Sequence, residues 1–482
     1  MGFDWLPQNV LQDRPVATRE ALDALDVTGL AEHQDEVEPG FAYLAVASPE
    51  QALVYARAAV ANGAVLVLAE QALPAPLPVP VLVIPRLAAQ RGELASRFYG
   101  DPSRRMTCVG VTGTNGKTSV AYHLAQLSGA MAEPAGYSGT LGWGRVEALA
   151  EAATTTANAV ALQRQLAGLL SQGCLRAMLE VSSHALSQGR ADAVAFKVGV
   201  FTNLTRDHLD YHHTMEAYGA AKARLFQDWS LDLAVLNADD EFARELAGKL
   251  RAPVVTYGHA GDWRWHLSDA PDGGVNVEWV SPVGPLRTTL AVGAEFVVAN
   301  LTAALATLAG LGHDRSQLQD ALAALGPVPG RMQVVPGGQD KPRVIVDYAH
   351  TPDALHKALD ALRSRTRGRL VCVFGCGGDR DEGKRPLMGE VAGELADHVV
   401  LTSDNPRSED PERIIEAIAA GVGETAHCVI PDRAAAIAAA IQSAAGDDVV
   451  LVAGKGHEDY QELADRRVPF DDCAVARSAL EA

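Results

Sequence analysis

Short runs rich in Val, Ile and Leu recur along the chain, and each ends abruptly in a loop rich in Gly, Asn, Asp or His. Ala-rich stretches of helical composition follow many of these runs. The clearest runs are residues 106–110, 177–181, 231–236, 344–346, 370–374, 398–401 and 449–452. Continuous apolar runs of this length, alternating with helices, are typical of buried parallel strands. The pattern predicts an α/β fold with mainly parallel sheets, in which ligands bind beyond the carboxyl ends of the strands.

The length of the chain indicates several domains. Its 482 residues exceed what a single hydrophobic core usually organises. The composition changes near residues 99–105 (YGDPSRR) and 330–343 (GRMQVVPGGQDKPR). We therefore expect three domains, at residues 1–100, 101–334 and 335–482.

Charge and composition exclude several functional classes. A formal net charge of −19 opposes binding to nucleic acid or to an anionic membrane. No apolar run is long enough to span a bilayer, and the first twenty residues show no export signal. The six cysteines form no CxxC pair, so neither a disulfide framework nor a zinc site is expected, and most are interpreted as buried thiols. These features favour a cytoplasmic globular protein.

The strongest chemical signal is a glycine-rich loop that follows the first of these strands. Residues 109–119 read VGVTGTNGKTS and open a helix predicted at residues 119–127. Backbone amides of such a loop surround phosphates, Lys117 reaches the terminal phosphates, and the Thr118 hydroxyl can bind Mg²⁺. Val111 stands where the general phosphate-loop pattern has glycine, so this loop is the TGTNGKTS variant. The alternative is a glycine turn without function.

Two further segments carry polar residues after strands. Glu180 ends the second strand, where one carboxylate beside a phosphate loop suffices for Mg²⁺. The alternative is that Glu180 only caps the following helix. Residues 201–212 read FTNLTRDHLDYH. This segment contains more Asn, Asp and His residues than the exposed face of an ordinary helix. By composition alone, Lys222 in the next helix would be an ordinary solvated lysine.

These three segments, in this order, resemble the central ATPase domain of the Mur ligase superfamily. Later motifs extend the resemblance towards the C-terminus: GRMQ at 330–333, DYAHTPD at 347–353 and FGCGGDRD at 374–381, which continues to Lys384, Arg385 and Pro386. The resemblance covers roughly residues 106–482. It implies three α/β domains, namely a small UDP-binding domain, a central phosphate-loop ATPase domain with a mainly parallel sheet, and a Rossmann-like C-terminal domain that receives the amino acid.

Within the superfamily, the DNPR and GKGHE segments resemble the enzyme that adds the third residue of the peptidoglycan stem peptide. These segments contain Asp404, Asn405, Pro406, Arg407, Gly454 and Glu458. The resemblance associates Arg407 with meso-diaminopimelate, whose second carboxylate a guanidinium can hold through two parallel hydrogen bonds. Arg380 could hold a carboxylate of the same amino acid, while Glu458 and the Gly454 carbonyl suit its distal ammonium. The alternative for Arg407 is a turn residue in a surface ion pair.

The resemblance also assigns residues to the nucleotide and the metal. It implies that Lys222 is carbamylated, and that the carbamate joins Thr118, Glu180 and His208 in holding Mg²⁺. The residues expected to bind ATP are Gly113, Thr114, Asn115, Gly116, Lys117, Thr118, Ser119, Asn203, His208, Asn300, Arg331, Asp347 and His350. Val297 replaces an asparagine that is usual near Asn300.

The nucleotide-sugar substrate is assigned in the same way. The resemblance implies that the UDP-N-acetylmuramoyl dipeptide contacts Thr155, Thr156, Ser182, Gln188 and Arg190. The N-terminal domain lacks the family's DSR and GxxxDG segments, so no uridine contact is predicted there. Pro39, Gly40 and residues 61–64 (ANGA) match the family scaffold.

The implied function is an ADP-forming carboxylate–amine ligase in peptidoglycan synthesis, and hence in cell wall biogenesis, cell shape and cell division. It would join meso-diaminopimelate to UDP-N-acetylmuramoyl-L-Ala-D-Glu with ATP and Mg²⁺, as a monomer. Three alternatives stay open. One is a sister ligase that uses L-lysine or belongs to the folylpolyglutamate type; another is a kinase or ATPase without ligation; the last is a catalytically lapsed binding homologue.

Overall fold

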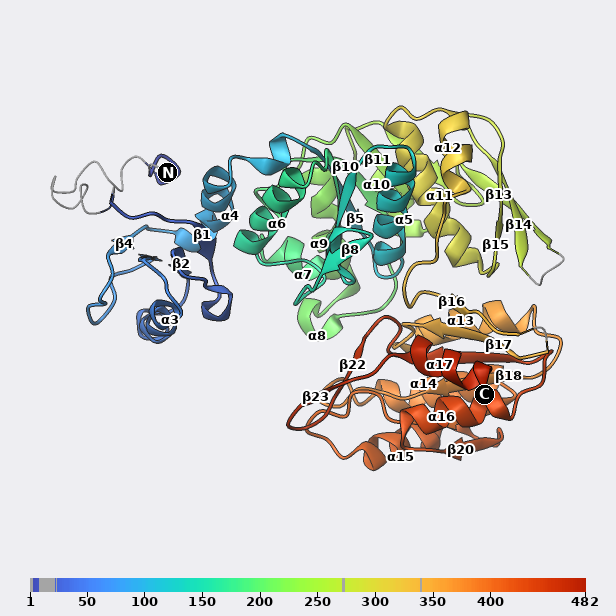
Figure 1. The fold of residues 1–482 in the computed structure, drawn as a ribbon. Coiled ribbons are helices and arrows are strands. Elements are labelled where there is room, and N and C mark those ends of the chain that lie inside the picture. The colour runs from blue at the N-terminus through green and yellow to red at the C-terminus, as the bar shows by residue number, and fades with distance from the viewer. Residues whose placement is uncertain (1–2, 8–21, 23, 271–273, 339) are drawn as a thin grey trace. The chain divides into compact units, whose positions relative to one another are not determined.

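The computed structural model describes residues 3–7, 22, 24–270, 274–338 and 340–482 (Figure 1). By its internal contacts the chain divides into two units. Unit 1 contains residues 1–263 and 303–324, and unit 2 contains residues 264–302 and 325–482. The predicted boundaries near residues 100 and 334 stay a prediction. The first twenty residues, on which the absence of an export signal rests, lie mostly outside the described residues.

A small parallel sheet opens unit 1. Its strands follow one another in space as in sequence: β1 (Gly29–Ala31), β2 (Phe41–Ala45), β3 (Leu66–Ala69) and β4 (Val81–Val83). Alternate strand residues pack on α3 (Pro49–Ala61) and α4 (Leu87–Phe98), one helix on each face. Gly40 and Gly63 both have positive φ, and the Gly40 amide donates to the Gly63 carbonyl, so a backbone hydrogen bond joins the PG and ANGA segments.

An eight-stranded sheet forms the rest of unit 1. In spatial order its strands are β12 (Val254–Tyr257), β11 (Leu233–Asn237), β10 (Phe196–Phe201), β5 (Thr107–Thr112), β9 (Arg176–Glu180), β6 (Ala135–Gly139), β7 (Gly142–Arg145) and β8 (Ala148–Ala150). The first six run parallel, and β7 and β8 add an antiparallel edge. The strands predicted at 106–110, 177–181 and 231–236 are confirmed, within one to two residues at their ends.

Helices cover both faces of this sheet (Figure 1). One face packs on α6 (Ala159–Ser171), α9 (Met215–Gln227) and α10 (Glu241–Ala247). Helix α5 (Lys117–Ala130) contacts β5, β6 and β9 and also α12 (Arg315–Leu322). The short helices α7 (Ser183–Ser187) and α8 (Leu209–His212) follow β9 and β10. Helix α11 (Glu295–Gly310) has residues in both units.

Unit 2 contains a six-stranded sheet and a three-stranded antiparallel sheet. The large sheet has the order β16 (Gln333–Val335), β17 (Arg343–Asp347), β21 (Val449–Ala453), β18 (Leu370–Phe374), β19 (His398–Leu401) and β20 (His427–Val429). All pairs except β16 with β17 are parallel, which confirms the four runs predicted here. The small sheet consists of β13 (Arg264–Asp269), β14 (Val275–Val280) and β15 (Leu286–Leu290).

The six-stranded sheet is the middle of three layers because its strand residues alternate between two cores. One core contains apolar residues of α13 (Pro352–Arg363), α14 (Lys384–Leu395) and α15 (Pro411–Val422). The other contains residues of α16 (Arg433–Gln442) and α17 (Asp472–Glu481). A hairpin of β22 (Tyr460–Glu462) and β23 (Arg467–Pro469) follows β21. The doubly covered sheet confirms the Rossmann-like expectation.

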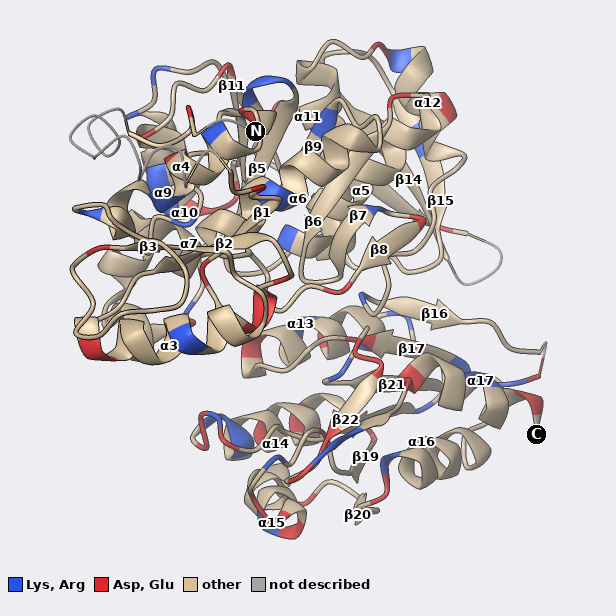
Figure 2. Ribbon diagram, turned by 60° about the vertical axis from the view of Figure 1, so that its left-hand side comes forward, with Lys and Arg blue, Asp and Glu red and all other residues tan. Residues whose placement is uncertain are grey.

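No helix in the described part of the chain is long and apolar enough to cross a membrane. Figure 2 shows Lys and Arg positions distributed among elements of both units. The six cysteines are unpaired thiols, and Cys108, Cys174, Cys372 and Cys376 are buried, as expected for core residues.

A fully buried ion pair joins α16 to α17. Arg433 donates to both carboxylate oxygens of Asp472, at 2.7 Å each, and both side chains are 0% exposed. The same guanidinium donates to the Ala453 carbonyl at 3.0 Å and to the Ser403 carbonyl at 3.5 Å. Arg433 therefore ties the end of β21 and the loop after β19 to the start of the last helix.

Replacement of Arg433 should destabilise the protein, because it leaves the buried Asp472 carboxylate without a partner. We expect Arg433→Met to lower the free energy of unfolding by about 3–5 kcal/mol, because Asp472 is left without its partner. The double variant Arg433→Met/Asp472→Leu should recover most of that loss. Urea denaturation followed by circular dichroism measures both, with Arg413→Met, at an exposed position of α15, as the control. A single variant as stable as the control would contradict this account.

Candidate active site

The glycine-rich loop connects β5 to α5 at the carboxyl end of the central sheet. Gly113 and Gly116 have φ values of 146° and 87°, which side chains rarely adopt. A Cβ on Gly113 would also collide with the Thr202 hydroxyl. The end of β10 holds the loop: the Asn203 amide side chain bonds to both the N–H and the carbonyl of Asn115, at 3.0 and 3.1 Å. The loop is therefore shaped by its neighbour strand before any ligand binds.

Two lysine side chains meet at one backbone oxygen of this loop. Lys117 Nζ and Lys222 Nζ donate to the Gly113 carbonyl at 3.0 and 2.7 Å. Lys222 is 1% exposed, and its Nζ lies 4.3 Å from the centroid of the Tyr218 ring. Burial, and then the charge of Lys117, hold the pKa of Lys222 well below its ordinary value, although Asp207 opposes this. The composition-based alternative of a solvated lysine is thus wrong.

Glu180 lies at the end of β9, 1% exposed, and its carboxylate faces the loop. Its Oε2 accepts from the Thr118 hydroxyl at 2.9 Å, and its Oε1 accepts from the Thr140 amide at 2.8 Å and from the Tyr137 hydroxyl. The cap of the following helix is instead Ser182, whose hydroxyl accepts from the Ala185 amide. The alternative that Glu180 only caps that helix is therefore wrong.

The donor set suits a small hard cation. The Thr118 and Glu180 oxygens lie 2.9 Å apart, which is roughly the spacing of neighbouring oxygen ligands around an octahedral Mg²⁺ with bonds of 2.0–2.1 Å. Within the described residues no three acidic, His or Cys side chains form a complete metal cluster.

His208 belongs to a group of rings beside Lys222. Its ring centroid lies 4.9 Å from that of His184 and 6.1 Å from that of Tyr218, and Asp207 approaches its Nε2 at 3.4 Å. Burial lowers the pKa of His208, Asp207 raises it, and Lys117 and Lys222 lower it further. Burial and the neighbouring histidines lower the pKa of His184 to about 4. These imidazoles are neutral at pH 7, the form in which histidine binds a metal.

The five residues expected to receive the nucleotide sugar form one connected network. The Thr156 hydroxyl donates to the Glu180 carbonyl at 2.7 Å and accepts from the Ser182 amide at 3.1 Å. Arg190 donates to the Thr156 carbonyl at 3.0 Å and to Gln188 Oε1 at 2.8 Å. The Thr155 hydroxyl accepts from Thr140, which also bonds to Glu180. Hydrogen bonds therefore connect these five residues to Glu180, the candidate metal ligand.

The remaining predicted ATP residues lie in unit 2. Asp347 ends β17 and accepts from the Met332 amide at 2.7 Å, and burial raises its pKa although Arg331 lowers it. The Arg331 guanidinium stacks 4.3 Å above the Tyr348 ring, which also contacts the His350 ring. Asn300 is buried on α11 of the same unit. Arg331, Asp347 and His350 thus surround one tyrosine that sequence reasoning did not single out.

A second polar cluster of unit 2 joins the DNPR loop to the GKGHE loop. Lys455 is fully buried, and its Nζ donates to Asn405 Oδ1 and to Glu458 Oε2, at 2.9 Å each. Asn405 Nδ2 donates to the same Glu458 oxygen at 2.8 Å. Asp404 lies at Gly454, where a Cβ would sit 2.6 Å from its Oδ2. The GKGHE motif contains Lys455, to which sequence reasoning assigned no role. Its hydrogen bonds show that it holds Asn405 and Glu458 together.

Arg407 and Arg380 differ in their surroundings. Arg407 has a left-handed backbone, with φ of 51°, and its Nη1 donates to the Gly378 carbonyl at 2.7 Å. Its Nε donates to Glu462 at 2.9 Å, so the ion pair foreseen as the alternative interpretation does form. Arg380 is exposed, and its Nη1 donates to the neighbouring Asp379 carbonyl.

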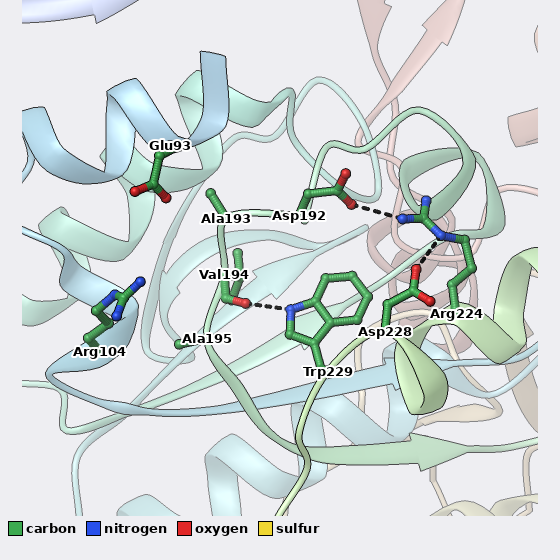
Figure 3. Close-up of a pocket in the computed structure, with 9 residues that line it drawn as sticks. All are labelled: Glu93, Arg104, Asp192, Ala193, Val194, Ala195, Arg224, Asp228 and Trp229. Carbon is green, nitrogen blue, oxygen red and sulfur yellow. Dashed lines mark hydrogen bonds and ion pairs between the residues drawn. The ribbon is translucent and has the colours of Figure 1, made fainter. Parts of the chain in front are cut away.

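A pocket of about 400 Å³ lies elsewhere in unit 1, between Arg104, Asp192, Arg224 and Trp229 (Figure 3). Residues 192–195 immediately precede β10, so this pocket is at the amino ends of the strands, and the phosphate loop is at the carboxyl ends. Arg224 is engaged by the Asp192 and Asp228 carboxylates. The pocket is therefore separate from the predicted site, and none of the predicted residues lines it.

Comparisons with known proteins match most of the chain. Residues 111–308 match the Mur ligase middle domain, and residues 330–456 match the glutamate ligase domain of Mur ligases. The chain is similar in sequence to curated UDP-N-acetylmuramoyl-L-alanyl-D-glutamate–2,6-diaminopimelate ligases. The one from Pseudomonas syringae pv. tomato is 51% identical over 84% of both chains, and that from Pseudomonas aeruginosa is 45% identical over 99% of both. A solved structure of such a ligase is 38% identical, with a TM-score of 0.66 over 94% of both chains.

The low pKa of Lys222 predicts a pH-dependent effect on stability. Unfolded Lys222 binds its proton up to its ordinary pKa of 10.5, whereas the native side chain releases it at a lower pH. Between these two values the unfolded state binds more protons, so this residue makes the protein more stable as pH rises. In bicarbonate-free buffer, Lys222→Met should therefore raise the free energy of unfolding at pH 7, because the substitution removes a buried amine that the native state disfavours in its charged form.

This gain should shrink as the pH approaches 10. Urea denaturation at pH 6, 7, 8.5 and 10 measures it, with Lys249→Met at an exposed position as the matched control. A Lys222→Met effect that is the same at every pH, or a loss of stability at pH 7, would mean that Lys222 is an ordinary charged lysine.

Proposed function

The chain belongs to the Mur ligase family, and from this premise we propose its function. It is an ATP-dependent ligase that joins meso-diaminopimelate to the γ-carboxylate of D-glutamate in UDP-N-acetylmuramoyl-L-alanyl-D-glutamate, a step of peptidoglycan synthesis. The observation that carries this proposal is the likeness to diaminopimelate ligases over almost the whole chain. The DNPR loop with Arg407 supports the choice of amino acid.

The loop between β5 and α5 holds the triphosphate. Its backbone amides, the N-terminus of α5 and the Lys117 ammonium supply positive potential where the γ-phosphate gathers charge. Lys117 now donates to the Gly113 and Thr114 carbonyls, and it exchanges these partners for phosphate oxygens when ATP binds. Arg331, Asp347 and His350 are assigned to ATP binding by the family resemblance.

The reaction has two displacement steps. The D-glutamate γ-carboxylate attacks the γ-phosphorus, a carboxyl oxygen–phosphorus bond forms, and ADP leaves. The amine of diaminopimelate then attacks the carbonyl carbon of this acyl phosphate, loses a proton, and inorganic phosphate leaves. Thr155, Thr156, Ser182, Gln188 and Arg190 orient the muramoyl dipeptide, so positioning supplies much of the rate enhancement.

Thr118, Glu180, His208 and a carbamylated Lys222 hold Mg²⁺ in this proposal. The ion neutralises phosphate charge. Carbamylation requires a neutral amine, which attacks CO₂ and releases a proton to give an N-carboxylate. Burial and the nearby Lys117 favour that neutral amine at Lys222. The product places a negative charge beside Lys117, where the neutral amine carried none.

The amino-acid site lies around the DNPR and GKGHE loops. Arg407 receives the distal carboxylate of diaminopimelate, with Arg380 at the other carboxylate, and Glu458 with the Gly454 carbonyl receives the ammonium. Lys455 and Asn405 hold Glu458 in place. The enzyme works in the cytoplasm as a monomer.

Choice of acceptor tests the function. We expect phosphate release from ATP only when both UDP-N-acetylmuramoyl-L-alanyl-D-glutamate and meso-diaminopimelate are present. With L-lysine instead, kcat/KM should fall by at least about 100-fold, because the Arg407 guanidinium then lacks its carboxylate. Phosphate release without amine would favour an ATPase, a preference for L-lysine would favour a sister ligase, and no release would favour a lapsed homologue.

Chemical rescue tests the carbamate. Lys222→Ala should lose most activity, on the order of 10²-fold or more, because one anionic oxygen ligand is missing. Acetate or formate should restore a measurable part of kcat by entering the space of the carbamate. Acetamide, which matches acetate in size without its charge, is the control. Equal effects of acetate and acetamide, or none from either, would count against carbamylation.

A further inference from the structure

The guanidinium of Arg407 is engaged by a carboxylate of its own chain. Arg407 Nε donates to Glu462 Oε2 at 2.9 Å, and the two side chains are only 22% and 28% exposed. Glu462 is the last residue of β22, in the hairpin that follows the GKGHE segment. A carboxylate therefore sits where the proposed function places the carboxylate of the incoming amino acid.

Backbone hydrogen bonds aim this glutamate at Arg407. The Arg407 amide donates to the Glu462 carbonyl at 3.1 Å, and the Glu462 amide donates to Asn405 Oδ1 at 2.9 Å. Gln461 Nε2 donates to the Asp404 carbonyl at 2.8 Å. Strand β22 thus lies alongside the whole DNPR loop. The ion pair follows from this fixed register and not from a chance meeting of two mobile side chains.

The contact occupies the edge of the guanidinium that matters for recognition. An arginine holds a carboxylate most strongly through two parallel N–H bonds, and its Nε edge offers one such pair together with Nη2. Glu462 accepts a hydrogen bond from Nε–H, and the Gly378 carbonyl accepts one from Nη1. A ligand carboxylate can use the Nε edge only after Glu462 has moved. A ligand carboxylate that binds the Nη1 and Nη2 end of Arg407 instead is still repelled by the negative charge of Glu462.

A second arginine can receive the displaced glutamate. Arg467, on β23 of the same hairpin, lies with its Nη2 3.7 Å from Glu462 Oε1. The Glu462 carboxylate can therefore leave Arg407 by a side-chain rotation and remain paired. Because the Glu462 carboxylate keeps an arginine partner throughout, its displacement from Arg407 costs little free energy.

We propose that Glu462 is an intramolecular competitor for the amino-acid site, a residue that occupies Arg407 until the distal carboxylate of the substrate displaces it. This inference rests on the proposed function of Arg407. Its consequence is a lower affinity for an amino acid with a distal carboxylate, which must take the place of Glu462, whereas an amino acid without one leaves Arg407 and Glu462 paired. Glu462 also keeps the Arg407 guanidinium paired with a carboxylate when no substrate is bound.

The test is Glu462→Gln, which keeps the shape of the side chain and removes its charge. We expect KM for meso-diaminopimelate to fall by about two- to fivefold, the factor that corresponds to the strength of a partly exposed ion pair. The kcat and the KM for ATP should stay within error of the wild type, because the hairpin and Arg407 remain. Steady-state phosphate release with the nucleotide sugar at saturation gives all three values.

Asp465→Asn is the matched control. It removes the same charge three residues away, at an exposed position in the turn of the same hairpin, and should leave KM for meso-diaminopimelate unchanged. An increase in KM for Glu462→Gln would mean that Glu462 orients Arg407, and an unchanged KM would mean that the pair is irrelevant; either result overturns the inference. Wild-type protein without diaminopimelate-dependent phosphate release would instead refute the proposed function itself.

Discussion

One backbone oxygen that accepts from two lysines is the constraint around which the central site is built. The Gly113 carbonyl receives both Lys117 Nζ and Lys222 Nζ, in a loop that Asn203 and Thr202 hold from the neighbouring strand. Two ammonium groups at this spacing repel each other, and the buried one gives up its proton most easily. An amine that gives up its proton more easily than an ordinary lysine provides a chemical reason for modification by CO₂ at this position.

Glu180 extends the same constraint to the substrate residues. Its carboxylate accepts from Thr118 on the loop and from Thr140 after β6, and its backbone carbonyl accepts from Thr156. Because all three contacts converge on the end of one buried strand, the candidate metal ligand, the phosphate loop and the candidate dipeptide site have little freedom to move apart. The same logic governs unit 2. There the buried Arg433 holds the ends of β21 and β19, and Lys455 joins the two loops that follow them.

Two arginines of unit 2, Arg433 and Arg407, show how a structural ion pair differs from one proposed for recognition. Arg433 is buried with Asp472 and is structural. Arg407 is about three-quarters buried, bonds to Glu462 and keeps access to solvent. A guanidinium that must recognise an anion needs both a fixed position and an exchangeable partner. The left-handed backbone and the bond from Nη1 to Gly378 provide the first, and Glu462 provides the second.

The amino-acid sequence by itself determined the parallel strands, the phosphate loop, the family motifs and the residues after each strand, because hydrophobic period and glycine spacing are local properties. Glu180 was predicted as a metal ligand from its position at the end of a strand, and Lys222 from the family resemblance. Only the tertiary structure decided their partners: Tyr137 and Thr140 at Glu180, Tyr218 at Lys222, Tyr348 beneath Arg331, and Glu462 at Arg407. These partners come from separate segments of the chain, so their proximity depends on strand order and on register, and no local pattern encodes either.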